Sequence, residues 1–224
     1  MNKIVVLSGA GISAESGLKT FRDEGGLWEG YNVYEVATPE AWKRNPELVL
    51  DFYNMRRKEI RNAKPNTAHK ALVDLEEKFD VTIVTQNIDD LHERAGSTRV
   101  LHLHGQINQA RSTFDHQVYD LSGTNLNLGM NCPKGYQLRP HIVWFGEPVP
   151  VIEEAIPYFR NADIVIVTGT SLAVYPAAGL INQASPSSKK YLIDPNPPSA
   201  MPDFEVISSK ASIGLPALVN KLLQ

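Results

Sequence analysis

The chain has 224 residues, of which 42% are hydrophobic and 21% charged, an ordinary composition for a globular protein with one good-sized core and a small appendage. The net charge of −3 gives no electrostatic basis for binding nucleic acid, and no run of 18 apolar residues predicts a membrane span. The single cysteine, Cys132, excludes an internal disulfide and a cysteine-based zinc site within one chain. The apolar run 4–7 is too short for a signal peptide, so we expect a cytoplasmic protein whose partners are neither membranes nor nucleic acids.

Predicted strands and helices alternate along the chain. Apolar runs predict strands at 3–7, 81–85, 100–104, 141–145, 163–168, 190–193 and 205–207, and helical patterns lie at 46–61, 66–78, 151–160, 176–184 and 214–223. This alternation predicts an α/β fold with a Rossmann-like, doubly wound parallel sheet. Two segments interrupt it: residues 25–62 look helical without strands, and residues 108–138 are polar and lack clear periodicity. We therefore expect a large domain of residues 1–24, 63–107 and 139–224, and a small, mainly helical lobe of residues 25–62 and 108–138.

The turn after the first predicted strand carries the most specific motif. Residues 9–22 read GAGISAESGLKTFR, and a strand that opens into G-x-G-x-x-A before a helical turn is typical of dinucleotide binding. Gly9 and Gly11 lack a Cβ, so backbone amides at the turn can approach a pyrophosphate closely. A plain strand–helix connection can use the same turn, and the motif becomes specific only through the serines, the third glycine and the Phe21-Arg22 pair that follow.

Two more polar clusters follow predicted strands, at the edge where open α/β sheets bind ligands. Residues 85–92 read TQNIDDLH, whose amides and carboxylates can hold ribose hydroxyls and an amide group; the alternative is that Asn87 or Asp89 only caps the next helix. Gly169-Thr170-Ser171 follows the strand 163–168 and suits a phosphate or a ribose, or is an ordinary turn with a capping hydroxyl.

A pair of histidines, His102 and His104, lies in the predicted strand 100–104, where positions two apart face the same side. A metal site would need a third ligand, which no convincing spacing supplies, and a lone strand histidine is more often structural. Gly105 follows His104 at the carboxyl edge of the strand, which favours a general base at His104.

Taken together, these segments resemble the sirtuin family of NAD-dependent protein-lysine deacylases. The resemblance lies in GAGISAESGLKTFR at 9–22, TQNIDDLHERAG at 85–96, LHGQ at 103–106, LRPHIVWFGE at 138–147 and GTSLAVYPAA at 169–178, in the family's order. It implies a Rossmann-type large domain with a small domain, NAD as cofactor, and acylated lysine side chains of proteins as partners. The sequence does not indicate an oligomeric state.

The resemblance also implies roles for single residues. His104 matches the catalytic base, and Asn87 and Asp89 match catalytic positions in the nicotinamide-ribose pocket. Residues that match cofactor contacts are Gly9, Ala10, Gly11, Ile12, Ser13, Phe21, Arg22, Gln86, Asn87, Ile88, Asp89, Gly169, Thr170, Ser171, Asp194, Pro195, Asn196 and Ala211. Asp194 stands where the family usually has asparagine, although its carboxylate could still accept hydrogen bonds from ribose hydroxyls. Val143 and Phe145 match the acyl-lysine tunnel, and Gly146 with Glu147 matches a strand edge to which a peptide adds.

In the reaction that the resemblance implies, the acyl oxygen of the substrate lysine attacks C1′ of the nicotinamide ribose, and nicotinamide leaves. His104, as neutral imidazole, takes a proton from a ribose hydroxyl, which then attacks the imidate carbon. The products are deacylated lysine and O-acyl-ADP-ribose. An unperturbed pKa of about 6.5 suits a histidine base at neutral pH.

The chain departs from the family at its zinc site. Most members bind a structural zinc through paired C-x-x-C motifs in the small domain, but this chain has only Cys132, and residues 110–114 carry Arg, Ser and Thr where the first pair is expected. One thiolate does not make a tetrahedral sulfur site. We therefore expect no zinc and a small lobe held by packing, with Phe114, Tyr119 and Tyr136 as candidates.

Tyr53 and Arg56 share one face of the predicted helix 46–61 and resemble the Y-x-x-R pair of bacterial sirtuins that remove acidic acyl groups. A guanidinium and a phenol can bind the terminal carboxylate of a succinyl or malonyl chain, and Ala41 stands where a small residue widens the pocket. The alternative is an amphipathic helix with Tyr53 packed and Arg56 solvated, in a plain lysine deacetylase.

Other functions are also compatible with a dinucleotide-binding fold. A nicotinamide oxidoreductase would have an acidic residue at the end of a second strand about 20 residues past the glycines, but Glu29 follows no predicted strand. A mono-ADP-ribosyltransferase would not need His104 or the acyl-tunnel residues, and a non-catalytic binding module would need none of the catalytic residues.

Overall fold

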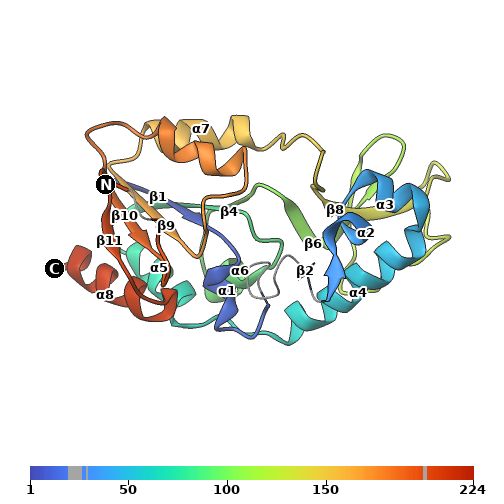
Figure 1. Ribbon diagram of the computed structural model, residues 1–224, viewed down its shortest axis with the longest axis horizontal. Helices are drawn as coiled ribbons and strands as arrows, with labels where there is room; N and C mark the ends of the chain where they lie inside the picture. Colours follow the sequence, from blue (N-terminus) through green and yellow to red (C-terminus); the bar gives the residue numbers. More distant parts are fainter. Residues whose placement is uncertain (20–26, 29, 199–200) are drawn as a thin grey trace.

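A six-stranded parallel sheet and a three-stranded antiparallel sheet organise the molecule (Figure 1). The computed structural model describes residues 1–19, 27–28, 30–198 and 201–224. Its larger sheet is six-stranded and parallel, in the order β11-β10-β9-β1-β4-β5. The strands are β1 (Lys3–Ser8), β4 (Asp80–Thr85), β5 (Val100–His102), β9 (Ile164–Thr168), β10 (Lys189–Ile193) and β11 (Glu205–Ile207). The Rossmann-like parallel sheet predicted from the apolar runs is thus confirmed.

The centre of this sheet is the strand β1, which pairs with β4 on one side and β9 on the other. Val6 lies opposite both Ile83 and Ile166 in the register. The chain moves outward from β1 through β4 to β5 and then returns to β9, so the strand order reverses beside β1. In open α/β sheets, the crevice at the carboxyl ends of the strands flanking such a reversal is the usual ligand site.

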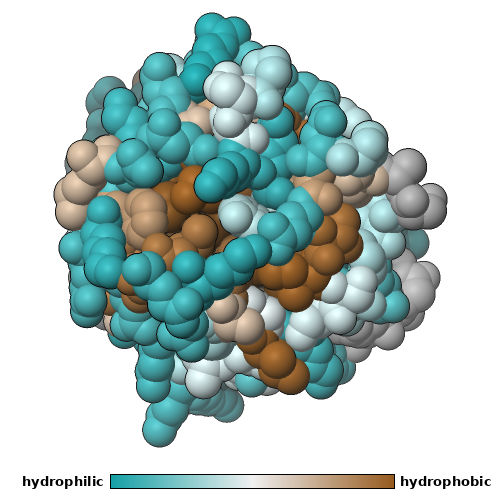
Figure 2. All heavy atoms as spheres, turned by 90° about the vertical axis from the view of Figure 1, so that its left-hand side faces the viewer, coloured by the Kyte–Doolittle hydropathy of each residue, from teal (hydrophilic) through white to brown (hydrophobic). Residues whose placement is uncertain are grey.

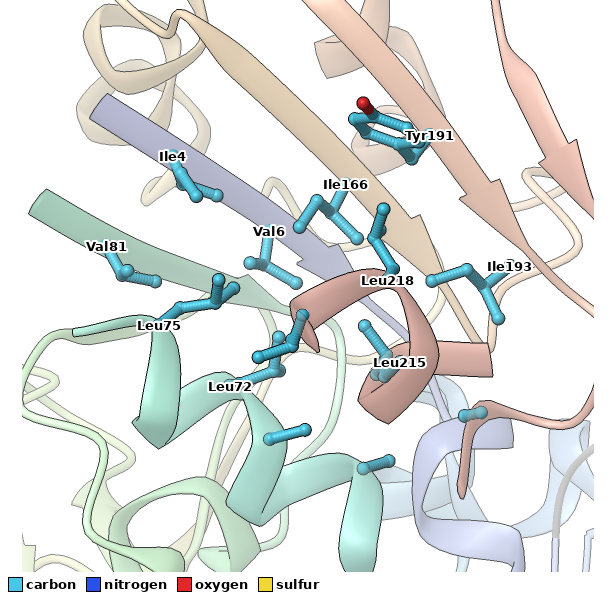
Figure 3. Packing of buried hydrophobic residues seen from close by; sticks show 14 of the residues in the cluster. Ile4, Val6, Leu72, Leu75, Val81, Ile166, Tyr191, Ile193, Leu215 and Leu218 are labelled. Atoms are coloured by element: carbon cyan, nitrogen blue, oxygen red, sulfur yellow. The ribbon is translucent and has the colours of Figure 1, made fainter. Parts of the chain in front are cut away.

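Helices cover both faces of the parallel sheet. On one face, α5 (Thr67–Leu75) and α8 (Ala211–Leu223) pack against each other and against the sheet, and Figure 3 shows their leucines, among them Leu72 and Leu215, pointing toward the apolar strand residues. On the other face lie α7 (Ile152–Arg160) and η1 (Ala177–Gln183), a 3₁₀ helix where a helix was expected at 176–184. Two short helices, α1 (Gly11–Ala14) and α6 (Leu91–Ala95), follow β1 and the β4 loop.

α8 begins three residues earlier than the helix predicted at 214–223. Gly214, the first residue of the predicted helix, and Pro216 both lie inside α8. A Cβ on Gly214 would lie 2.7 Å from Ile193 Cγ2, so this glycine is where α8 comes closest to the sheet. Close packing, rather than helix termination, therefore explains the glycine.

The remaining elements lie around a second, antiparallel sheet with the order β7-β6-β8, at the opposite end of the molecule from the chain termini (Figure 1). Its strands are β6 (Gly105–Ser112), β7 (Val118–Asp120) and β8 (Leu138–Ile142). The helices α2 (Val33–Val36), α3 (Pro39–Arg44) and α4 (Pro46–Asn62) pack beside it, and β2 (Leu27–Trp28) pairs with β3 (Tyr31–Asn32). Asn45 caps α4 by accepting a hydrogen bond from the Leu48 amide, as the Pro46 start predicts.

Here the sequence predictions were least accurate. The predicted strand 100–104 ends at His102 and the predicted strand 141–145 is displaced to 138–142, while residues 25–62 include two short strands and residues 105–112 form a strand that was not predicted. The physical reasons are local: β6 is largely polar, β8 contains Pro140, and Gly105 has φ of +81°. A Cβ on Gly105 would overlap the His141 carbonyl, so the chain turns there from one sheet to the other. The small lobe is consequently mixed rather than mainly helical, and the exact domain boundaries remain a prediction.

Packing and polar contacts hold the end of the small lobe around Cys132. Cys132 is buried in an apolar cluster with Ala110 and Leu138, against which Tyr119 packs. Phe114 and Tyr136 stack with ring centroids 4.2 Å apart, but both remain partly exposed. Lys134 forms a 2.8 Å ion pair with Asp115. Among the described residues, no group of three or more His, Cys, Asp or Glu is arranged to hold a metal, and the expected absence of zinc remains a prediction.

The face around the carboxyl terminus has a hydrophilic rim with hydrophobic side chains toward its centre (Figure 2). It includes the edge of the parallel sheet at β11, which is only three residues long. Such a short edge strand offers few backbone groups for pairing with another chain.

Within the described ranges, none of the helices combines the length and the apolarity that crossing a membrane requires.

Candidate active site

The turn after β1 is locked against the turn after β9. The Gly9 amide donates to the Thr168 carbonyl at 3.1 Å, and the Gly11 amide donates to the Gly169 carbonyl at 2.8 Å. A Cβ on Gly9 or Gly11 would lie 2.8 Å from atoms of the 169–170 turn, and a Cβ on Gly169 would overlap the Ile12 amide nitrogen. Glycine is therefore needed at these positions so that two loops can touch at the strand-order reversal. From the sequence we expected a different reason, the close approach of a pyrophosphate to the Gly9 and Gly11 amides.

A buried polar cluster joins α1 to the loop after β4. Ser13 Oγ donates to Asp89 Oδ2 at 3.0 Å and accepts a hydrogen bond from Asn87 Nδ2 at 3.2 Å. Asp89 Oδ1 accepts the Leu91 amide at 3.1 Å. Burial raises the pKa of Asp89, although these hydrogen bonds favour its carboxylate and oppose the rise. Asp89 thus accepts an amide of the first turn of α6, although the N-cap residue itself is Asp90, and its second oxygen joins the cluster with Ser13 and Asn87.

The same loop reaches the β9 turn through Gln86. Gln86 Nε2 donates to Thr170 Oγ1 at 3.0 Å, and Thr170 Oγ1 also accepts the Leu172 amide, as in an ordinary capping turn. Thr170 is buried and Ser171 is exposed. Gln86, Thr170 and the glycine turns thus lie together at the carboxyl edge of the sheet, as expected from the ends of β1, β4 and β9.

His104 lies two residues after the end of β5, half-buried and held in one tautomer. Its Nδ1 lies 3.0 Å from the Gln86 carbonyl oxygen, which can only accept, so Nδ1 carries the proton and Nε2 is the basic nitrogen. Burial lowers the pKa of His104, and the bond to Gln86 offsets this only in part. His104 is therefore a neutral imidazole near neutral pH, the form that a general base requires.

The residues expected at the adenine end lie past β10. Asp194 is 3% exposed, and its Oδ1 accepts the Asn196 amide at 2.8 Å. Pro195 and Asn196 are exposed, while Ala211 is the buried first residue of α8. Since β10 is next to β9, these residues are on the β9 side of the strand-order reversal, and Gln86 and His104 are on the β4 side.

Tyr53 and Arg56 both lie on the buried side of α4. Tyr53 is 0% exposed and its hydroxyl accepts a 3.0 Å hydrogen bond from Trp144 Nε1, and Ala41 is buried in the same apolar cluster. Arg56 is 4% exposed and its Nη1 lies 2.9 Å from Glu59 Oε2. The alternative of a solvated Arg56 is therefore wrong, whereas Tyr53 is packed as that alternative expected.

The segment after β8 differs from the expected strand edge. Val143 is half-buried, its amide donates to the His104 carbonyl, and Phe145 is 47% exposed. Gly146 has φ of +87° in a turn, and Glu147 accepts the Trp144 amide at 2.9 Å, so neither residue belongs to a strand. The positive φ of Gly146 ends the extended backbone that the apolar run 141–145 predicted.

An ion-pair cluster that the sequence did not reveal holds this segment in place. Glu147 accepts hydrogen bonds from Arg139 at 2.7 and 3.0 Å and from Arg111 at 2.9 and 3.0 Å. The Arg139 guanidinium lies 3.2 Å from the centroid of the Trp144 ring. Arginines of β6 and β8 thus hold the segment that carries Trp144 and Phe145. The only signal in the sequence is that Glu147 follows an apolar run closely, which could have indicated that its carboxylate is buried beside a cation.

Phe21 and Arg22, expected over the cofactor, lie outside the described residues. Asn66, expected only as a helix start, also donates to the Ile12 carbonyl at 2.9 Å and to Ser16 Oγ at 3.0 Å. These hydrogen bonds join the start of α5 to α1 and to the residues that follow it. Ile88 is half-buried between Asn87 and Asp89. Nearly all the predicted cofactor residues in the described ranges therefore line up along one edge of the sheet, while Tyr53, Arg56 and Ala41 belong to the neighbouring helices.

Known proteins resemble this chain over its whole length. Residues 9–176 match the model of the Sir2 family. An NAD-dependent protein deacylase of Helicobacter pylori (strain J99 / ATCC 700824) is 50% identical over 226 residues, which cover 100% of this chain and 97% of the relative. One from Aggregatibacter actinomycetemcomitans is 57% identical over 193 residues, covering 86% and 93%. The crystal structure of a Sir2 homolog–NAD complex superposes with a TM-score of 0.89 at 39% identity, covering 99% of this chain and 89% of that one. The chain therefore belongs to the Sir2 family.

Proposed function

We infer that the chain is an NAD-dependent protein deacylase, which removes acyl groups from lysine side chains of proteins. The observation that carries this inference is His104, a half-buried neutral imidazole with its basic nitrogen at the edge of the sheet where Ser13, Asn87 and Asp89 form a buried polar cluster. Relatives that are 50–57% identical carry the same activity in their names.

The chemistry of the donor set suits NAD, which would serve as the acyl acceptor and supply the ribose carbon and hydroxyl that react. Asn87 offers an amide and Asp89 a carboxylate toward the nicotinamide-ribose side, and Asp194 offers a carboxylate for ribose hydroxyls at the adenine side. Burial of all three lowers the local dielectric and strengthens such hydrogen bonds.

His104 would act once nicotinamide has left. Its Nε2 takes a proton from a ribose hydroxyl, while its Nδ1–H remains bonded to the Gln86 carbonyl and fixes the ring. When NAD is bound, its ribose would supply the hydroxyl that takes over the acyl group, and one water would be consumed as the C–N bond to the acyl group breaks and the lysine amine is released. The products are deacylated lysine, nicotinamide and O-acyl-ADP-ribose.

The test is a set of matched acetyl, succinyl and malonyl peptides assayed with and without NAD. Nicotinamide release should keep pace with peptide deacylation, and neither should occur without NAD. His104→Ala should lower turnover by several orders of magnitude, and circular dichroism should report an unchanged fold. Full deacylation without NAD would refute the proposed function, and near-normal turnover in the variant would remove His104 from this role.

We further propose that acidic acyl groups are preferred substrates. Support comes from Arg56, a buried cation on the same helix face as the Tyr53 hydroxyl. Trp144 donates to the Tyr53 oxygen, and the hydroxyl keeps its own hydrogen as a donor. A terminal carboxylate there would accept charge-assisted bonds from the guanidinium.

A plain lysine deacetylase and a mono-ADP-ribosyltransferase remain the alternatives. Equal efficiency on acetyl and succinyl peptides would favour the first, and transfer of labelled ADP-ribose to protein without acyl loss would favour the second. A cytoplasmic location and protein substrates, without nucleic acid or membrane partners, complete the proposal and rest on the single cysteine, the net charge and the names of the relatives.

A further inference from the structure

His102, two residues before the proposed base, is a buried histidine with both ring nitrogens engaged. Its side chain is 4% exposed. Nδ1 lies 2.9 Å from the Asn87 carbonyl oxygen, and Nε2 lies 2.6 Å from Glu93 Oε1. The two histidines thus bond to consecutive carbonyls, His104 to that of Gln86 and His102 to that of Asn87.

The imidazole rings of His102 and His104 differ in the number of protons that they carry. The Asn87 carbonyl can only accept a hydrogen bond, so Nδ1 of His102 must donate to it. Nε2 faces a carboxylate at a distance short even for a charge-assisted N–H···O bond, so a proton lies between them as well. With a proton on each nitrogen the ring of His102 is a cation, whereas no carboxylate of the described residues bonds to His104, which is neutral.

We propose that His102 is an imidazolium, held by Glu93, that positions the nicotinamide-ribose loop at Asn87 and keeps Asp89 ionised. The proposal rests on the assignment of this loop to the NAD site. His102 acts here as a positioning residue, because it reaches the site through the Asn87 backbone and through its charge.

The charged and titratable groups around His102 are consistent with a cation. On α6, Glu93 is the ion-pair partner and His92 is a buried histidine whose pKa burial and the neighbouring histidines lower well below its usual value. In the loop after β4, Asp89 is buried and is favoured as a carboxylate by His102. Burial alone would lower the pKa of His102, but Glu93, the Asn87 carbonyl and Asp89 reverse this and raise it.

Glu93→Gln separates charge from hydrogen bonding. The amide of glutamine can donate to Nε2 of a neutral His102 while Nδ1–H still donates to Asn87, so every bond is kept and the positive charge is lost. Glu93 is 40% exposed, and the new amide therefore stays hydrated on its outer side. Glu77→Gln is the matched control, because Glu77 is exposed on the surface after α5 and undergoes the same change.

The direct measurement is the protonation of the ring by long-range ¹H–¹⁵N NMR at pH 7. Wild-type protein should show one of its six histidines with both ring nitrogens protonated, and this signal should become a neutral tautomer in Glu93→Gln but not in Glu77→Gln. His102→Gln, if it folds, assigns the signal by its loss. A neutral His102 in the wild type would overturn the proposal.

The functional measurement is the pH dependence of kcat/KM for NAD. Without the cation, Asp89 should take up a proton at higher pH, and kcat/KM should fall about five-fold on the acid side, with little change at pH 8. Glu77→Gln should follow the wild type. Superimposable profiles for Glu93→Gln and wild type would refute the positioning role while leaving deacylation intact. A protein that consumes no NAD at any pH would instead refute the proposed function, and the NMR signals would still report the charge of His102.

Discussion

Arg56→Met provides the sharpest test of the acyl preference. Methionine roughly keeps the volume and removes the cation, so acetyl turnover should change little while succinyl turnover falls. A hydrogen bond to a charged group contributes about 1.5–3 kcal/mol. Because Glu59 already pairs with Arg56, a substrate carboxylate replaces one partner with another, and we use the lower part of this range. About 1.5–2 kcal/mol corresponds to a 10–30-fold loss in kcat/KM for succinyl over acetyl peptide.

Two variants on the same helix act as controls. Lys58→Met removes a positive charge from an exposed position of α4 and should leave the succinyl-to-acetyl ratio unchanged. Glu59→Gln removes the competing carboxylate and should raise the ratio. If the ratio stays constant in Arg56→Met, Arg56 does not bind the acyl carboxylate, and the acidic-acyl proposal should give way to plain deacetylation.

Three further predictions concern positioning, pH and metal. Trp144→Phe keeps an aromatic ring but removes the donor to Tyr53, worth about 1 kcal/mol, and should lower the succinyl-to-acetyl ratio about five-fold, whereas Trp42→Phe should not; equal ratios in both would contradict the orienting role of Trp144. Burial lowers the pKa of His104, so the imidazole stays unprotonated at pH values below the ordinary pKa of histidine. The value of kcat/KM for acyl peptide should therefore begin to fall only below about pH 6.5, and a decline that starts above pH 7 would be inconsistent with this. Elemental analysis of protein purified without added metal should find well under one zinc per chain, and chelator should leave the unfolding transition unchanged; stoichiometric zinc would reveal a site involving Cys132 that was overlooked.

Much of the fold could be predicted because buried parallel strands are continuous apolar runs. β1, β4, β9 and β10 were each located to within one residue for this reason. The antiparallel sheet was not predicted, because β6 has polar residues on its half-buried face and its register shifts between Gly105 and Ala110. Such a strand is defined by its partners and by the turn at Gly105 rather than by its own periodicity.

The candidate site was likewise predictable from the sequence only in part. The turns after strands were predictable, because parallel strands bring their carboxyl ends to one edge, and the structure brings Ser13, Gln86, Asn87 and Asp89 together there. Contacts across the small lobe were not: nothing in the local sequence pairs Glu147 with Arg111 from 36 residues away. The protonation states of the two histidines were equally hidden, because each depends on the acceptors that surround the ring.

The most direct test of the central claim is mass spectrometry of the products from an acylated peptide and NAD. Transfer of the acyl group to ribose with His104 as base predicts one nicotinamide and one O-acyl-ADP-ribose for every deacylated lysine. In His104→Ala, deacylated lysine and O-acyl-ADP-ribose should be absent, and nicotinamide should not be released in multiple turnovers, because His104 acts after nicotinamide has left. Free carboxylic acid with intact NAD would indicate simple hydrolysis, and ADP-ribose attached to protein with the acyl group still on lysine would indicate a transferase. Either result would contradict the proposed function.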